Sequence, residues 1–366
     1  MRLINLLSWL PGHSGFGSYV QRVVPEIDGL RLQLGSDGLA QLLDPDHWQP
    51  QSPPWAPGKY MRLLQRYSLV QHGLNFSDVL FRHDFHVDQL EAIYSPFFDA
   101  LLCCPDVPQL ITCHDLTPLS ASNSCKAWLR YKFWQPRHCS TASRLIAISR
   151  YVADQLVLFG IDSSRIEVIP NGVTIQRPPI GGPASTDLLV LARHDVNKNL
   201  LTLLRGVSLL QRQAPNWRGI LRIVGRNGRQ TSKLMKLRQE LPRPQQVQFI
   251  NSISQDELVN LFRASFALIS ASSEEGFDYP ILEAKAEGLP TLISDIRVHK
   301  EFHSGSSLFF PTHDDGHIFA QQVMQLLIDH SLWKQLSTSG FDLACSLSIR
   351  LQVQRISDQF SSLVSL

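Results

Sequence analysis

The chain has 366 residues, of which 43% are hydrophobic and 18% charged, and its formal net charge is only +2. This length favours two domains, each large enough to bury a core of its own. The near-neutral charge excludes a general electrostatic affinity for nucleic acid. The apolar run at the N-terminus is about ten residues long, too short to cross a bilayer. We therefore expect a cytoplasmic protein, attached at most peripherally to the inner face of the plasma membrane.

Cysteine spacing gives no indication of a metal site. No two cysteines have CxxC spacing, and no array of cysteines and histidines is present. We expect buried free thiols in a reducing compartment. The six cysteines are Cys103, Cys104, Cys113, Cys125, Cys139 and Cys345.

Short apolar runs alternate with amphipathic stretches through the first half of the chain. Helical spacing of apolar residues is found, for example, at Gly17–Val24 and Arg150–Leu158. Strands that alternate with helices predict a parallel, doubly wound sheet, so we assign residues 1–175 to one α/β domain. The strands predicted there are Leu3–Leu10, Ala92–Tyr94, Gln109–Cys113, Arg144–Ile148 and Ile166–Ile169.

The same alternation restarts in the second half. Residues 176–187 are rich in proline and glycine and predict a linker. A second α/β domain is predicted over 188–346, and the helical spacing over 347–366 predicts a helix that packs back on the first domain. The predicted strands are Leu188–Leu191, Leu221–Val224, Val247–Ile250, Ala267–Ser270 and Thr291–Ser294, and the predicted helices are Leu200–Gln213, Gln255–Arg263, Pro280–Glu287 and Asp314–Asp329.

Two glutamates flank a predicted junction between loop and helix. Glu275 and Glu283 are separated by seven residues, and Pro280 marks the first turn of the helix. The backbone N–H groups at a helix start attract anions, and a carboxylate one turn further along accepts hydrogen bonds from a diol. The pattern predicts one cavity lined by both glutamates. The alternative is that both carboxylates only stabilise the helix dipole.

Two cations bracket the loop after the first strand of the second domain. Arg193 and Lys198 lie between Leu188–Leu191 and the following helix. Ligands of open α/β sheets bind at the carboxyl ends of strands, and a guanidinium fork with an ammonium suits a diphosphate. The alternative is a pair of surface cations.

The first half contributes two weaker signals. Gly15 and Gly17 lie between the first strand and the first helix, where glycine lets the backbone approach a ligand, although the third glycine of a dinucleotide fingerprint is missing. His114 follows a predicted strand and could bind a sugar hydroxyl, or it could be a structural histidine.

Basic and aromatic residues alternate in two acid-free stretches, 59–67 and 126–150. This pattern suits an anionic partner such as a lipid headgroup or a phosphate. A solvated helix face that packs its aromatics inward explains it equally well. The residues of the second stretch are Lys126, Trp128, Arg130, Tyr131, Lys132, Phe133, Trp134, Arg137, Arg144 and Arg150.

The order of these motifs resembles the family-four retaining glycosyltransferases, which have the GT-B fold of two Rossmann-like domains facing a cleft. The resemblance covers nearly the whole chain. It rests on SGFGSY (14–19), CHDL (113–116), LIAISRYVADQL (145–156), IEVIPNGV (166–173), LARHDVNKN (191–199), LRIVGRNG (221–228) and EGFDYPILEA (275–284).

The resemblance implies a role for each site residue. Arg193 and Lys198 would bind the donor pyrophosphate, Glu283 the ribose, and Glu275 would face the donor sugar. His114 would contact that sugar near the reacting carbon. The backbone would contribute at Gly15, Gly17, Gly276, Phe277, Asp278 and Tyr279. Asp278 and Tyr279 depart from the family, which usually has a glycine and an aliphatic residue at these positions, and this bears on donor identity.

The resemblance also implies the reaction. A hexose, mannosyl- or glucosyl-like, would pass with retention from a GDP- or UDP-linked sugar to a saccharide or lipid-linked acceptor in bacterial surface polysaccharide synthesis. No metal or other cofactor is obligatory for this chemistry. Two alternatives remain on the same architecture, namely a nucleotide-sugar 2-epimerase and a non-catalytic protein that binds sugar nucleotides.

Overall fold

The structure is a computed structural model that describes residues 1–9, 15–34, 40–49, 89–102, 104–120 and 125–365. The chain divides into two compact units. The first comprises Met1–Asn171 and Ile349–Leu366, and the second Gly172–Ser348. The segment 172–187, which contains the predicted linker, is therefore part of the second unit. The predicted basic stretch 59–67 lies outside the described residues.

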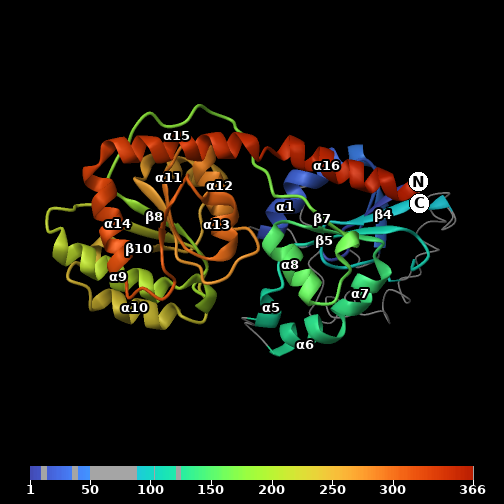
Figure 1. The fold of residues 1–366 in the computed structure, drawn as a ribbon, viewed down its shortest axis with the longest axis horizontal. Coiled ribbons are helices and arrows are strands. Elements are labelled where there is room, and N and C mark those ends of the chain that lie inside the picture. The colour runs from blue at the N-terminus through green and yellow to red at the C-terminus, as the bar shows by residue number, and fades with distance from the viewer. Residues whose placement is uncertain (10–14, 35–39, 50–88, 103, 121–124, 366) are drawn as a thin grey trace. The chain divides into compact units, whose positions relative to one another are not determined.

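A mixed sheet forms the centre of the first unit (Figure 1). Among the described residues its order is β3-β2-β1-β4-β5-β6-β7, and only the pairing of β2 with β3 is antiparallel. The strands are β1 (Arg2–Asn5), β2 (Leu30–Leu34), β3 (Ala40–Leu43), β4 (Ala92–Ser95), β5 (Gln109–Cys113), β6 (Arg144–Ala147) and β7 (Ile166–Val168). The helices are α1 (Gly15–Val23), α5 (Thr117–Ser120), α6 (Cys125–Phe133), α7 (Gln135–Thr141), α8 (Arg150–Leu158) and α16 (Ile349–Ser362).

The first strand is shorter than predicted. The prediction of Leu3–Leu10 is wrong because β1 ends at Asn5. The Asn5 side chain donates to Ser95 Oγ at 2.9 Å and accepts from the backbone N–H of Leu7 at 3.2 Å, so the chain turns away from the sheet there. The apolar run continues past the strand because three residues there are also buried, namely Leu6, Leu7 and Trp9. These residues do not extend the strand.

The second unit is a parallel sheet of order β10-β9-β8-β11-β12-β13 with helices on both faces (Figure 1). Each strand after β8 is reached through a helix or a crossover, which is the doubly wound arrangement that the sequence predicted. The strands are β8 (Leu188–Leu191), β9 (Leu221–Val224), β10 (Val247–Ile250), β11 (Ala267–Ser270), β12 (Thr291–Ser294) and β13 (Leu308–Phe310). The helices are α9 (Leu200–Gln213), α10 (Thr231–Gln239), α11 (Gln255–Ala264), α12 (Tyr279–Ala286), α13 (Arg297–His303), α14 (His317–Ile328) and α15 (His330–Ser346).

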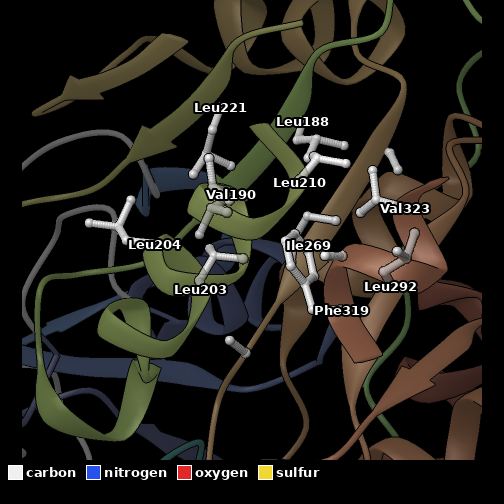
Figure 2. Close-up of a cluster of buried hydrophobic side chains, with 14 of the residues drawn as sticks. Leu188, Val190, Leu203, Leu204, Leu210, Leu221, Ile269, Leu292, Phe319 and Val323 are labelled. Carbon is white, nitrogen blue, oxygen red and sulfur yellow. The ribbon is translucent and has the colours of Figure 1, made fainter. Parts of the chain in front are cut away.

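Successive residues of β8 enter the cores on opposite faces of this sheet. Leu188 and Val190 belong to a cluster with residues of α9 and α14, shown in Figure 2. Leu189 belongs to a second cluster that includes Phe262 and Ile281 from α11 and α12. Strands buried on both faces read as continuous apolar runs, which is why the sequence showed them clearly.

The last helix, α16, completes the first unit. The ring of Phe360 is buried, and its centroid lies 5.9 Å from that of Tyr94 on β4. Arg144 of β6 donates to Gln359 Oε1 at 2.8 Å, and Arg355 donates to the carbonyl of Val168 at 2.9 Å. The C-terminal stretch thus packs on the first sheet.

The cysteines differ in part from the prediction. Cys104, Cys113 and Cys139 are buried free thiols, whereas Cys125 and Cys345 are exposed free thiols on α6 and α15. Burial raises the pKa of the Cys139 thiol to about 12, so this group stays protonated. The prediction of burial is therefore wrong for the two exposed thiols. The sixth cysteine, Cys103, lies outside the described residues.

Candidate functional site

The second sheet has a point where the strand order reverses. The chain runs from β8 to β9 and β10 on one side and then returns to place β11 on the other side of β8. Ligands of open α/β sheets bind outside the carboxyl ends of the strands at such a switch point. The two loops that leave this point are 192–199 after β8 and 271–278 after β11. These are the two loops that the sequence singled out.

Side-chain and backbone contacts join the two loops. Lys198 Nζ forms an ion pair with Glu275 Oε1, and both side chains are largely buried. The backbone N–H of Ser273 donates to the carbonyl of Asn197 at 2.8 Å. Asn199 takes the left-handed conformation with φ 50°, which ends the short turn holding Lys198 and starts α9. The predicted phosphate ligand and the first glutamate therefore lie together.

Arg193 lies on the loop after β8, whereas Glu283 lies in α12, the helix that follows the loop after β11. The Arg193 side chain is 64% exposed, and its Nε lies 3.3 Å from Asp195 Oδ2. Glu283 is half-buried within α12, one turn from the helix start. An exposed guanidinium and a largely buried ammonium on one loop could both reach the same diphosphate.

The segment from Gly276 to Tyr279 enters α12 through a left-handed residue. Gly276, Phe277 and Asp278 are buried, and the Phe277 ring packs 4.8 Å, centroid to centroid, from Phe302 of α13. Asp278 has φ 69°, a conformation that glycine adopts freely and aspartate tolerates. Burial would raise the pKa of Asp278, but the Lys198 charge and hydrogen bonds from His299 and Ser270 hold it well below its usual range. Asp278 is therefore an ionised carboxylate inside the protein.

A third loop supports the first through close backbone packing. A Cβ at Gly225 would overlap the carbonyl oxygen of Ala192, and one at Gly228 would lie 2.5 Å from that of His194. The turn after β9 therefore presses directly against the turn after β8. His194 Nδ1 lies 3.0 Å from Thr231 Oγ1, which fixes the same loop to α10. The two glycines thus help to position the loop that carries both predicted cations.

The remaining predicted site residues lie in the first unit. Gly15 and Gly17 fall within α1, and the segment just before it is not among the described residues. His114 is buried, donates from Nε2 to the carbonyl of Pro96 at 2.9 Å, and meets the Tyr19 ring edge-on at 4.5 Å between centroids. Burial lowers the pKa of His114 to about 4, so the ring is neutral at pH 7. Its contact with a donor sugar stays a prediction.

Two kinds of feature are missing from the described residues. Within them, no three side chains of His, Cys, Asp or Glu come together as metal ligands would. No helix in the described part of the chain is both long and apolar enough to cross a membrane.

Two family models match most of the chain. The model described as Glycosyltransferase Family 4 matches residues 34–177, and that described as Glycosyl transferases group 1 matches residues 182–341. The chain belongs to the family-four glycosyltransferases. The second match contains both loops of the switch point, so the candidate site lies in the part that this family shares.

Curated relatives of this chain include proteins named for mannosyl transfer. The O-antigen chain mannosyltransferase RfbU of Salmonella typhimurium is 25% identical over 211 residues, 57% of this chain and 58% of the relative. The GDP-mannose:cellobiosyl-diphosphopolyprenol alpha-mannosyltransferase of Xanthomonas oryzae is 30% identical over 233 residues, 62% of this chain and 58% of the relative. The matched region is thus less than two thirds of either relative.

A solved structure supports the GT-B fold over the full length. HepE from Anabaena, crystallised in complex with UDP and glucose, superposes with a TM-score of 0.73 and 17% sequence identity. The match covers 99% of this chain and 100% of that protein. At this identity the likeness shows the fold alone. The two Rossmann-like units of this chain therefore have the GT-B fold.

The sequence missed one polar group of the site. His299 on α13 lies against Asp278, with Nε2 3.2 Å from Oδ2, and both side chains are almost fully buried. These residues are 21 positions apart. Only the packing of α13 over the loop after β11 brings them together, and no local pattern around His299 signals it.

Proposed function

We propose that this glycosyltransferase transfers a hexose, with retention of configuration, from a nucleotide-diphosphate sugar to a saccharide or lipid-linked acceptor in bacterial surface polysaccharide synthesis. The observation that carries the proposal is the contact between Lys198 and Glu275 across the switch point of the second sheet. The relatives named for O-antigen and polyprenol-linked mannosyl transfer support the acceptor class. GDP-mannose and UDP-glucose are the two donors to be tested first, since GDP-mannose is named for one relative and UDP accompanies the structural neighbour.

The chemistry follows from where charge develops. When the bond from sugar to phosphate breaks, negative charge accumulates on the departing diphosphate. We expect Lys198, Arg193 and the N-terminal end of α12 to stabilise that charge, and the ion pairs of both cations on the loop after β8 support this expectation. A diphosphate oxygen then takes the acceptor proton while the new bond forms on the same face of the sugar. Glu275 orients Lys198 and the sugar, and Glu283 accepts hydrogen bonds from the ribose.

The membrane-facing part of the proposal rests on α6 and α7. Phe133 and Leu129 are 59% and 47% exposed. Lys132 Nζ lies 4.6 Å from the Trp128 ring centroid, and the guanidinium carbon of Arg137 lies 4.6 Å from that of Trp134. Exposed apolar side chains among cations stacked on aromatic rings suit the interface of an anionic membrane. A lipid-linked acceptor would be met at that surface.

Lys198→Ala tests the assignment of the diphosphate site. Loss of one charged group that stabilises the leaving diphosphate commonly costs on the order of 100-fold in turnover. We expect at least that loss, with an unchanged circular dichroism spectrum.

Donors are first identified by thermal shift with UDP-, GDP- and ADP-linked sugars, where a ligand at about 100 times its dissociation constant adds about 2.7 kcal/mol of stability.

The control is Lys334→Ala, which removes an exposed lysine on α15 of the same unit. Its turnover should match that of the unmodified protein. Near-normal turnover of Lys198→Ala, or stabilisation by no sugar nucleotide at all, would show that the assignment is wrong.

A further inference from the structure

An acidic residue stands at the start of α12, where the proposed function places an anion. Asp278 directly precedes the helix, at the position where aspartate ordinarily accepts a hydrogen bond from the first turn. Its carboxylate makes no such bond to its own helix. Oδ2 instead accepts from Ser270 Oγ at 2.6 Å and lies 3.2 Å from His299 Nε2. The side chain is thus held by the strand behind it and by α13.

Both nitrogens of the His299 ring lie beside hydrogen-bond acceptors. The ring is fully buried, and Nδ1 lies 2.9 Å from the carbonyl oxygen of Ser294. The Ser294 hydroxyl, 3.1 Å from Nδ1, donates its proton to the carbonyl of Ser272 and so has none for the ring. Both ring nitrogens therefore face acceptors, a carbonyl and an ionised carboxylate. A histidine that donates from both nitrogens is an imidazolium with a positive charge.

A positive charge beside Asp278 matters because this carboxylate also interacts electrostatically with Lys198, whose charge helps to lower the pKa of Asp278. An unpaired carboxylate at this place would repel a diphosphate and offset part of the attraction of Lys198. A buried ion pair with His299 is neutral as a whole. The pair therefore removes the repulsion without removing the acidic residue that forms the left-handed turn.

We propose that His299 is a positioning residue that turns the Asp278 carboxylate into the protein and neutralises it, so that an anionic donor can bind beside an acidic side chain. The proposal rests on the function proposed above. It predicts that the effect of His299 depends on the charge of the ligand and not on the stability of the unit. A purely structural histidine would affect charged and uncharged ligands equally.

His299→Gln and His299→Leu test this dependence. Glutamine keeps a donor toward Asp278 without the charge, and leucine removes both. We expect each variant to bind UDP or GDP about tenfold more weakly, because His299 no longer neutralises the buried charge of Asp278. Binding of uridine or guanosine, which carry no phosphate, should change by less than about twofold. Calorimetry measures the nucleotides, and ligand-observed NMR measures the nucleosides.

A second substitution provides a rescue. The double variant combines Asp278→Asn with His299→Leu, and asparagine tolerates the left-handed conformation while carrying no charge. We expect its affinity for the diphosphates to return to within about threefold of the original value. The matched control is His303→Leu on the same helix, because His303 is also buried and neither of its ring nitrogens has a hydrogen-bond partner in the described structure. This control should leave diphosphate affinity unchanged.

The outcomes separate the two proposals. If the unmodified protein binds none of UDP, GDP and ADP, the proposed function fails and this inference fails with it. If the protein binds one of them and Lys198→Ala weakens that binding while both His299 variants bind normally, only the role of His299 is overturned. Equal losses for nucleotides and nucleosides, or no recovery in the double variant, also overturn it.

Discussion

Burial shifts the pKa values of single residues in this protein, and His114 is the clearest case in the first unit. Its Nε2 donates to the Pro96 carbonyl, and its ring lies against that of Tyr19. Burial lowers its pKa from 6.5 to about 4. The folded protein therefore keeps this ring neutral at a pH where the unfolded chain protonates it.

The sign of the pH effect follows from this shift. Between pH 6.5 and about 4 the unfolded state binds more protons at this position, so His114 lowers stability as the pH falls through that window. The loss is roughly 3 kcal/mol when complete. We expect His114→Gln, which can still donate to Pro96, to make the decline of stability shallower over this window. Urea unfolding at several pH values measures the difference, and parallel curves for both proteins would contradict it.

At the scale of elements, the sequence predicted what depends on local pattern. The helix α8 has the predicted bounds, Arg150–Leu158, because Ser149 caps it by accepting from the N–H of Val152 at 3.1 Å. The central strands of the second sheet were predicted because they are apolar on both faces. Elements with polar sequences, such as α10 and α13, were not predicted. The strand β2 was not predicted either, because Arg31 interrupts its apolar pattern. In the structure Arg31 is buried, and its guanidinium donates to backbone carbonyls.

The candidate site likewise has parts that local sequence pattern predicts and parts that it does not. The loops of Lys198 and Glu275 were recognisable because each follows an apolar strand and precedes a helix. That β8 and β11 are neighbours depends on strand order, and the pairing of Asp278 with His299 depends on where α13 packs. Neither the strand order nor this pairing can be predicted from a local stretch of sequence.

The helix α16 gives a testable case of an element that completes a distant sheet. Phe360 is 1% exposed, and truncating a buried phenylalanine costs about 3–5 kcal/mol. We expect Phe360→Ala to accelerate amide hydrogen exchange in β4 and β6 while β8 and β9 remain protected. Leu351→Ala, at a residue of the same helix that is 47% exposed, is the control and should change neither. Equal acceleration in both units would contradict the division of the chain into two units.

At the scale of the whole molecule, the charge is nearly balanced, so attraction to a membrane has to come from a local surface. We expect the protein to bind vesicles that contain phosphatidylglycerol and to be released by salt, because surface charges are screened within about 8 Å at physiological ionic strength. Phe133→Ser with Lys132→Glu should reduce this binding strongly. Lys334→Glu with Met235→Ser, which changes an exposed lysine and an exposed apolar residue of the second unit, is the matched control. Binding that is equal in all three proteins, or absent from the start, would contradict a membrane role for α6 and α7.

The way the chain is divided has a consequence for its synthesis. Residues 172–348 form one uninterrupted unit, whereas the first unit needs 349–366 to cover its sheet. During synthesis, the part of the first unit made before residue 349 therefore lacks the helix that covers its sheet. Its apolar surface stays exposed to solvent until residues 349–366 have left the ribosome. The order of maturation is then the reverse of the order of translation, and the half proposed to hold the nucleotide is the first to reach its final form.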